Sequence, residues 1–161
     1  MHGFAFTTAP VCGLTMRLVD RVILGDTPEG FRLTGFLGEG RADGPRLKGA
    51  ILKGGADWAY IRPDGVLSAE VKLHLRTDDG ALIQIFYEGV VDMGPDAYER
   101  VRQGQPLGPV FHPRTAVRML THAADYLWVN RRQFIGIGYL DYSHGNGAIS
   151  YDIHELRTPD N

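Results

Sequence analysis

The sequence feature that most constrains the fold is a block of glycine- and carboxylate-rich turns between Gly49 and Ile83. Its turn motifs read Gly54-Gly55-Ala56-Asp57-Trp58, Arg62-Pro63-Asp64-Gly65 and Arg76-Thr77-Asp78-Asp79-Gly80. Glycine, proline and aspartate supply the backbone conformations that tight turns need. The segments between the turns alternate apolar and polar residues, which is typical of strands with one buried face. The block therefore predicts strands joined in sequence by short turns.

The clearest alternation runs from Val66 to Arg76. Its apolar positions share one face, and these are Leu67, Ala69, Val71, Leu73 and Leu75. Its polar positions share the other face, and these are Ser68, Glu70, Lys72, His74 and Arg76. The Asp78-Asp79-Gly80 turn then leads into Ala81 to Val91, which is rich in the Ile, Phe, Tyr and Val that strands prefer. We expect a long antiparallel hairpin here.

The rest of the chain reads as further short strands. They are expected at Thr15–Leu24, Phe31–Leu37, Leu47–Leu52, Trp58–Ile61, Thr115–Thr121, Phe134–Tyr142 and Ala148–Leu156, the last two joined by a turn at Ser143–Gly147. A polar loop is expected through Asp43-Gly44-Pro45 and a proline-rich loop at Gln105–Pro113, with one short helix at Pro95–Gln103 and a helical turn at Ala123–Asp125.

Eight to ten short strands with one helix predict an all-β fold, either a barrel or a sandwich. We favour a single antiparallel β-barrel of the calycin or lipocalin type, formed by one domain over residues 1–161, because closure removes exposed strand edges.

The composition excludes several classes of function. The formal net charge of −2 gives no electrostatic footprint for nucleic acid or for an anionic membrane. No apolar stretch approaches the roughly 20 residues needed to span a bilayer. The single Cys12 excludes an internal disulfide and favours a reducing compartment. The first residues lack the features of a signal peptide, so we expect a cytoplasmic protein.

Taken in order, these motifs resemble a known family. The resemblance rests on Arg46-Leu47-Lys48-Gly49, the three turn motifs above, Tyr126-Leu127-Trp128-Val129-Asn130, Gly136-Ile137-Gly138 and Tyr151-Asp152-Ile153. Together they are similar to the pattern of the domain-of-unknown-function family DUF3237 (UPF0311-like) over about Met16–Leu156. Only Gly104–Arg114 departs from that pattern, since it is longer and richer in proline.

The resemblance implies a small calycin-like barrel and leaves the activity open, because the family as a whole is uncharacterised. Some of its members resemble auxiliary enzymes of small-molecule, secondary metabolism, which favours catalysis without naming a reaction.

Asp57 is the first candidate for a catalytic group. It lies between a Gly-Gly turn and Trp58, whose indole would raise the pKa of the carboxyl and suit it to proton transfer. The alternative is an Asx-turn that orders the loop. Asp79, beside Arg76, is a candidate second carboxylate, although the chemistry of a hairpin tip also explains it.

Aromatic and polar residues supply candidates for substrate binding. The predicted set is Trp58, Arg62, Tyr87, Tyr126, Trp128 and Asn130. Aromatic rings could form the floor of a cavity, but barrel packing needs the same residues. Asn130, which follows an expected aromatic strand, could donate an amide hydrogen bond to a carbonyl or could cap a turn.

No cofactor or metal is expected. The histidines show no H-x-H or H-E-x-x-H spacing, and Gly136-x-Gly138 lacks the third glycine and the helix of a dinucleotide-binding motif.

Two functions from different classes remain. The favoured one is a cofactor-free enzyme of the isomerase, cyclase or lyase type, in which a buried carboxylate transfers a proton on an aromatic or carbonyl-bearing substrate. Asp57 would be the acid or base, while Arg62 or Arg76 and Asn130 would orient the substrate. The alternative is a non-catalytic barrel that binds or carries a small molecule. A structural role, with the Val66–Arg76 face paired in a homodimer, is a third reading.

Overall fold

The computed structural model describes residues 5–143 and 147–158. Its elements are β1 (Thr7–Thr27), β2 (Gly30–Leu37), β3 (Gly40–Asp43), β4 (Gly49–Ile51), β5 (Gly55–Ile61), β6 (Val66–Thr77), β7 (Leu82–Asp92), α1 (Ala97–Arg102), β8 (Val110–Phe111), β9 (Arg114–Leu120), the 3₁₀ helix η1 (Ala124–Arg131), β10 (Phe134–Asp141) and β11 (Ala148–Arg157). No helix in this part of the chain is long and apolar enough to cross a membrane.

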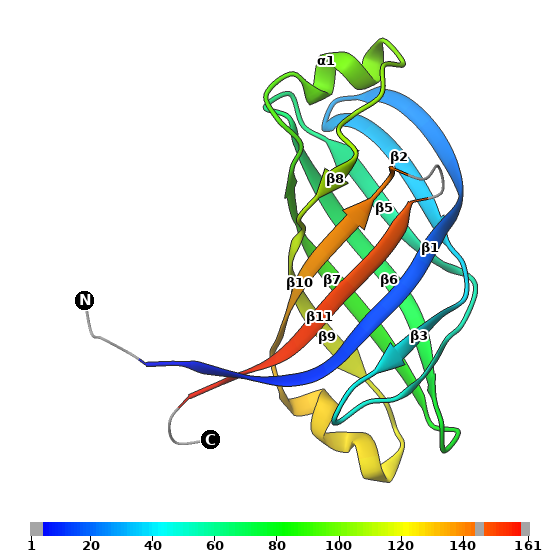
Figure 1. The fold of residues 1–161 in the computed structure, drawn as a ribbon, viewed down its shortest axis with the longest axis vertical. Helices are drawn as coiled ribbons and strands as arrows, with labels where there is room; N and C mark the ends of the chain where they lie inside the picture. Colours follow the sequence, from blue (N-terminus) through cyan, green and yellow to red (C-terminus); the bar gives the residue numbers. More distant parts are fainter. Residues whose placement is uncertain (1–4, 144–146, 159–161) are drawn as a thin grey trace.

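The strands form one antiparallel sheet that curls into a barrel, as the sequence predicted (Figure 1). Five strands follow one another in the order β6-β7-β9-β10-β11, and β11 then pairs with β1. The long strand β1 is connected to β6 by two series of paired strands, which close the ring. Its first half pairs with β3, which continues through β4 to β6, and its second half pairs with β2, which continues through β5 to β6.

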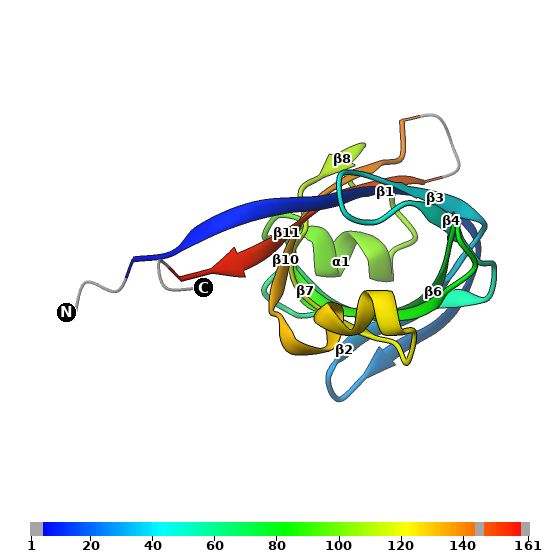
Figure 2. The same ribbon diagram turned by 90° about the horizontal axis from the view of Figure 1, so that it is seen from below.

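Two helices lie at opposite ends of the barrel, with α1 above and η1 below in Figure 1. Figure 2 shows the ring from below, with the first part of β1 and the last part of β11 projecting together as a two-stranded arm.

The predicted hairpin is confirmed as β6 and β7, which pair from Val66↔Asp92 to Arg76↔Leu82. The five apolar positions of β6 are all buried, while its polar face is largely exposed. Period-2 alternation thus determines which face of this strand enters the core.

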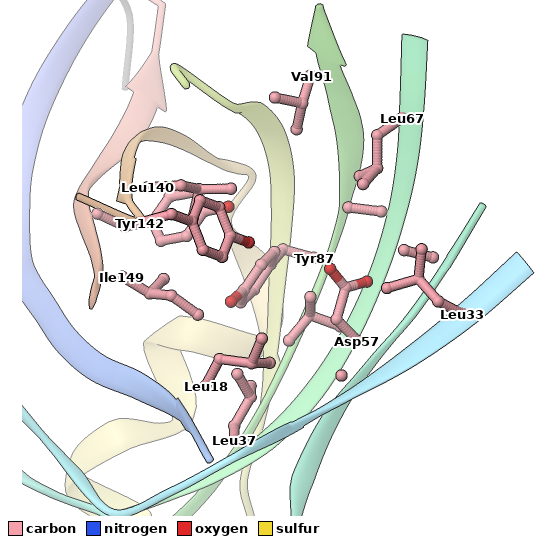
Figure 3. A pocket seen from close by; sticks show the side chains of 15 residues that line it. Leu18, Leu33, Leu37, Asp57, Leu67, Tyr87, Val91, Leu140, Tyr142 and Ile149 are labelled. Carbon is pink, nitrogen blue, oxygen red and sulfur yellow. The ribbon is translucent and has the colours of Figure 1, made fainter. Parts of the chain in front are cut away.

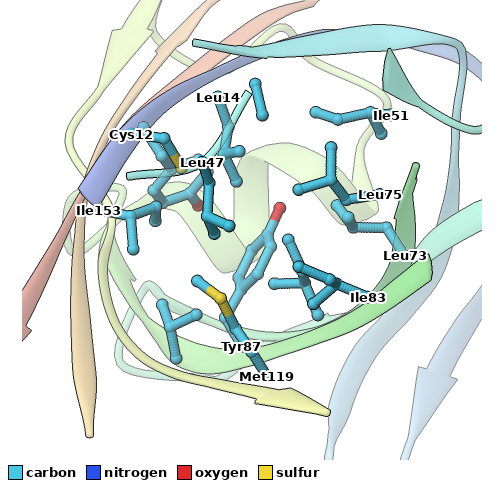
Figure 4. Close-up of a cluster of buried hydrophobic side chains, with 14 of the residues drawn as sticks. Cys12, Leu14, Leu47, Ile51, Leu73, Leu75, Ile83, Tyr87, Met119 and Ile153 are labelled. Carbon is cyan, nitrogen blue, oxygen red and sulfur yellow. The ribbon is translucent and has the colours of Figure 1, made fainter. Parts of the chain in front are cut away.

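The core consists of two clusters of apolar side chains. The larger one fills the lower barrel around Leu14, Leu73, Ile85 and Phe134, and Figure 4 shows part of it. The smaller one lies under α1 and contains Phe31, Ile61, Leu67 and Ala97, among others.

The buried Glu155 carboxylate belongs to the lower end of the barrel and forms ion pairs with Arg46, Arg132 and Arg157. The guanidinium of Arg46 also lies 3.7 Å from the centre of the Trp128 ring.

Several expected boundaries were wrong. β1 does not end before Gly25 but continues to Thr27, because Gly25, with φ 87°, occupies a register shift within the strand instead of opening a turn. The expected polar loop before Gly44 contains β3, which forms because Gly40–Asp43 finds partners on both sides in β1 and β4. The expected proline-rich loop contains the short strand β8, which pairs with β10.

The helical segments also differ from expectation. α1 begins at Ala97, two residues after Pro95, with Asp96 at its N-cap. The predicted helical turn at Ala123–Asp125 continues as η1 to Arg131, so Asn130 follows no strand. Residues 144–146 of the predicted Ser143–Gly147 turn lie outside the described residues.

Candidate functional site

A cavity lies inside the barrel where the two core clusters meet (Figure 3). Its volume of about 60 Å³ admits several water-sized groups. Its walls are mostly aliphatic, from Leu18, Leu33, Leu37, Ala59, Leu67, Ala69, Val71, Val91, Leu140 and Ile149, with Gly35. The polar groups on the walls are Asp57 and the tyrosines at positions 87, 142 and 151. A single carboxyl and a few phenols in an apolar container are the arrangement expected of a small-molecule site.

Asp57 points into this cavity because of its place in β5. Ala59 and Ile61 continue the same inward face, whereas the intervening Trp58 points outward. The backbone N–H of Glu70 donates a hydrogen bond of 3.0 Å to Asp57 Oδ1. Burial raises the pKa of Asp57 from its usual 3.8 to about 6, against the lowering effect of that hydrogen bond. The carboxyl is therefore held in place and titrates close to neutrality.

Three tyrosines face the same space as Asp57. Figure 3 shows Asp57, Tyr87 and Tyr142 among the side chains that surround the cavity. The rings of Tyr87 and Tyr151 lie 5.0 Å apart, centre to centre. Burial raises the pKa of all three phenols, and the negative charge of Asp57 contributes to each increase. The hydroxyl groups therefore stay protonated and remain hydrogen-bond donors at physiological pH.

Gly35 leaves room for the side chain of Leu18 in the cavity wall. It pairs with Asp57 across β2 and β5, and both residues line the cavity. A Cβ atom at position 35 would lie 2.6 Å from Leu18 Cδ1, so even alanine would force the leucine to move. The absence of a side chain at position 35 thus lets Leu18 pack into the cavity wall.

The barrel wall beside the cavity has a seam, which is the place where β1 changes its strand partner from β11 to β2. Among the described residues, β11 pairs with β1 as far as Arg17↔Ala148, and from Leu18 onward β1 pairs with β2. The wall residues on the two sides of this seam are Leu18 on β1 and Leu140, Tyr142 and Ile149 from β10 and β11. Tyr142 is 37% exposed at this seam.

Two of the predicted site residues, Asp57 and Tyr87, come together in the cavity. Asp79 does not join them, because it lies at the β6–β7 turn, where it accepts hydrogen bonds from Thr77 and Tyr126. Those bonds lower the pKa of Asp79 and keep it ionised. Arg76 is exposed on the polar face of β6.

The other predicted residues also contact groups outside the cavity. Trp58 is 39% exposed on the outer surface, with the Lys72 ammonium 5.5 Å from the centre of its ring. Arg62 pairs with Asp64 within a turn. Trp128 packs against Phe134 at the lower end. Asn130 accepts a hydrogen bond from the Thr121 N–H and donates one to the Thr121 carbonyl, which is the turn-capping alternative.

Sequence reasoning missed Tyr142 and Tyr151. A signal for Tyr151 was present, since it alternates with Ile149 and Ile153 in a predicted strand and so had to share their inward face. Tyr142 ends the predicted strand Phe134–Tyr142, where alternation puts it on the same face as Leu140, although β10 itself ends at Asp141.

The chain matches the family model described as "Protein of unknown function (DUF3237)" over residues 6–156. It belongs to the DUF3237 family. A UPF0311 protein of Rhodopseudomonas palustris is 32% identical over 132 residues, which cover 80% of this chain and 85% of the relative. A UPF0311 protein of Clostridium acetobutylicum is 30% identical over 97 residues, covering 60% of this chain and 61% of that protein. This agrees with the resemblance found in the motifs.

Solved structures confirm the DUF3237 fold. A protein of unknown function from R. palustris superposes with a TM-score of 0.81 at 26% identity, covering 95% of this chain and 99% of the other. A "beta-barrel like protein" from Acinetobacter baumannii gives 0.78 at 25% identity, covering 95% and 97%. A structure described as an enzyme from Penicillium herquei gives 0.67 at 16% identity, covering 95% and 98%, which shows a shared fold alone.

Proposed function

We propose that this protein is a cofactor-free acid–base enzyme in which Asp57 moves a proton on a small carbonyl-bearing substrate held in the barrel. The observation that carries the proposal is the position of Asp57, an inward carboxyl with a pKa of about 6 among protonated tyrosines. A general acid or base works best when its pKa lies near the operating pH. A carboxyl at its usual pKa would be a weaker base and a scarcer acid.

The tyrosines supply the complementary role. When a base removes a proton from the carbon beside a carbonyl, negative charge develops on the carbonyl oxygen. Phenol hydroxyls that remain protonated can donate hydrogen bonds to that oxygen, and the apolar walls strengthen these bonds by excluding water. Tyr142 and Tyr151 are the proposed donors, and Tyr87 supports the ring of Tyr151. Delivery of a solvent-exchanged proton to the same carbon would give exchange, and delivery to another carbon would give isomerisation. Elimination would result if the electron pair expelled a leaving group from the β carbon and Asp57 passed its proton to that group.

The fold shared with the P. herquei enzyme supports catalysis in general terms, without indicating a reaction. The aliphatic and aromatic walls favour a compact apolar or aromatic substrate.

Hydrogen–deuterium exchange tests the proposal without knowledge of the natural substrate. Small ketones and aldehydes that carry an aryl group and a hydrogen on the carbon next to the carbonyl are incubated with the protein in D₂O, and loss of that hydrogen is followed by NMR. Asp57→Asn should slow exchange roughly 10²- to 10⁴-fold, the range typical of general acid–base catalysis. Asp43→Asn is the matched control, because Asp43 is an exposed carboxylate outside the cavity.

Exchange that proceeds equally fast in Asp57→Asn would contradict the proposal. Compounds that bind the wild type in the cavity yet never exchange would instead favour the carrier function.

A further inference from the structure

Arg21 is an exposed residue of β1 that lies on the same face of the sheet as residues of β2 that line the cavity. It pairs with Gly35 across β1 and β2, and the neighbouring pair Ile23↔Leu33 follows the same face. Directly paired residues of antiparallel strands project to the same side of the sheet. Since Gly35 and Leu33 line the cavity, Arg21 projects from the cavity side of the sheet.

The charge of Arg21 acts on the cavity. It lowers the pKa of the Tyr142 phenol, although burial and then Asp57 outweigh it and the net shift is upward. The side chain is exposed, and none of the ion pairs found among residues 5–143 and 147–158 includes its guanidinium. On the same face of β1, Asp26 is already bound to Tyr98 and Arg102 of α1. Within the described part of the chain, the Arg21 guanidinium therefore has no carboxylate partner, and it lies near an apolar cavity.

We infer that Arg21 binds a carboxylate of the substrate, so that the cavity takes small aromatic or branched acids that bear a carbonyl group. The role of the bound acid as a substrate rests on the proposed function, whereas the binding of a carboxylate by Arg21 can be tested independently of any reaction. The apolar body of the ligand would occupy the leucine- and tyrosine-lined interior, with its carboxylate at the seam.

Two physical reasons favour a carboxylate. The planar guanidinium presents paired N–H donors that match the two oxygens of this anion, and Arg21 needs no rearrangement of an existing ion pair to use them. Binding at the exposed Arg21 also leaves the carboxylate partly hydrated, which avoids the large cost of transferring an ion into the apolar interior.

Binding of a homologous series of aryl carboxylates tests the inference. The probes are benzoate, phenylacetate and 3-phenylpropanoate, each compared with its neutral primary amide. Dissociation constants are measured by NMR titration of the ¹⁵N-labelled protein at about pH 5, where Asp57 is protonated and does not repel the probe. Shifts of the Gly35 and Ala59 amides report occupation of the cavity.

The substitution is Arg21→Gln, with Arg17→Gln as the matched control. Arg17 is exposed on the same strand between the inward-facing Met16 and Leu18, so it projects from the outer face. At least one carboxylate should bind the wild type and Arg17→Gln more tightly than its amide. Arg21→Gln should weaken that carboxylate roughly 10- to 100-fold and leave the amide unchanged, as expected for loss of a charge-assisted hydrogen bond.

The inference would be overturned if Arg21→Gln weakened binding of the carboxylate and of its amide equally, or if both arginine variants weakened carboxylate binding equally. It would also be overturned if the wild type bound no carboxylate more tightly than its amide. Binding that depends on Arg21, combined with no proton exchange on any ligand, would uphold the inference while the proposed function fails.

Discussion

Replacing Asp57 by asparagine should stabilise the protein at neutral pH and leave it nearly unchanged at acid pH. Asparagine has the same shape, and its side-chain oxygen can still accept the hydrogen bond from the Glu70 N–H. What the substitution removes is the ionisation of a carboxyl in an apolar cavity. The folded-state pKa of about 6 lies above the usual 3.8, so the folded protein keeps a proton that the unfolded chain has already released. Wild-type stability therefore falls as pH rises from about 4 to beyond 6.

The size of this effect follows from the pKa difference. The interval between 3.8 and about 6 corresponds to about 3 kcal/mol. For a domain of this size that is a change of roughly 6 to 12 °C in melting temperature. The stability difference between Asp57→Asn and wild type should thus grow by about this amount between roughly pH 4 and pH 8.

Urea unfolding at a series of pH values, followed by circular dichroism, measures this difference. Asp43→Asn, which changes an exposed carboxylate, should track the wild type throughout. Contributions from other titrating groups cancel when the variant is compared with wild type at each pH. A difference that stays constant between about pH 4 and pH 8 would refute the reasoning.

Three further predictions follow from the same geometry. Gly35→Leu should displace the cavity-lining Leu18 and abolish binding of aryl ligands in the NMR titration, while the far-ultraviolet circular dichroism stays native. Unimpaired binding would place the site elsewhere. Wild-type proton exchange, if Asp57 is the base, should rise with pH through about 6 and then level off, whereas a rate that falls through the same range would make it the acid. Glu155→Gln should destabilise the fold by roughly 1 to 3 kcal/mol in urea unfolding, because Arg46 and Arg157 lose their buried charged acceptor.

The stability difference between Glu155→Gln and wild type should depend on pH in the opposite sense to the difference between Asp57→Asn and wild type. Burial alone would raise the pKa of Glu155, but hydrogen bonds from Arg157 and Arg46 outweigh it and lower the pKa. The stability that this carboxylate contributes is therefore present above its unfolded pKa of about 4.5 and is lost as pH falls through the folded value. Wild type and Glu155→Gln should accordingly converge in acid.

The barrel was predictable because its signals are local. The alternation of Val66 to Arg76 fixes both the strand and its buried face, and Gly80 after two aspartates marks the turn that reverses it. Local patterns do not predict a strand that forms only because of its pairing with segments distant in the sequence. Gly40–Asp43 becomes a strand only because β1 and β4 lie on either side of it.

The site was predictable in part for the same reason. The chemical type of Asp57 and its place in a strand indicated a candidate, and Tyr87 lies on the inward face of a predicted strand. The position of Arg21, by contrast, depends on its pairing with Gly35 across a bulged strand. Trp58 misled because its sequence neighbour Asp57 points to the opposite face, as adjacent strand residues must.

The measurement that tests the account most directly is the titration of the Asp57 carboxyl itself. Protein labelled with ¹³C in its aspartate side chains gives one carboxyl resonance per residue, and the Asp57→Asn spectrum identifies the signal of interest. The account predicts a midpoint of about 6 in the empty protein. A midpoint near the usual 3.8 would show that the carboxyl is well solvated. Asp57 would then be no better suited to proton transfer than an ordinary surface carboxyl.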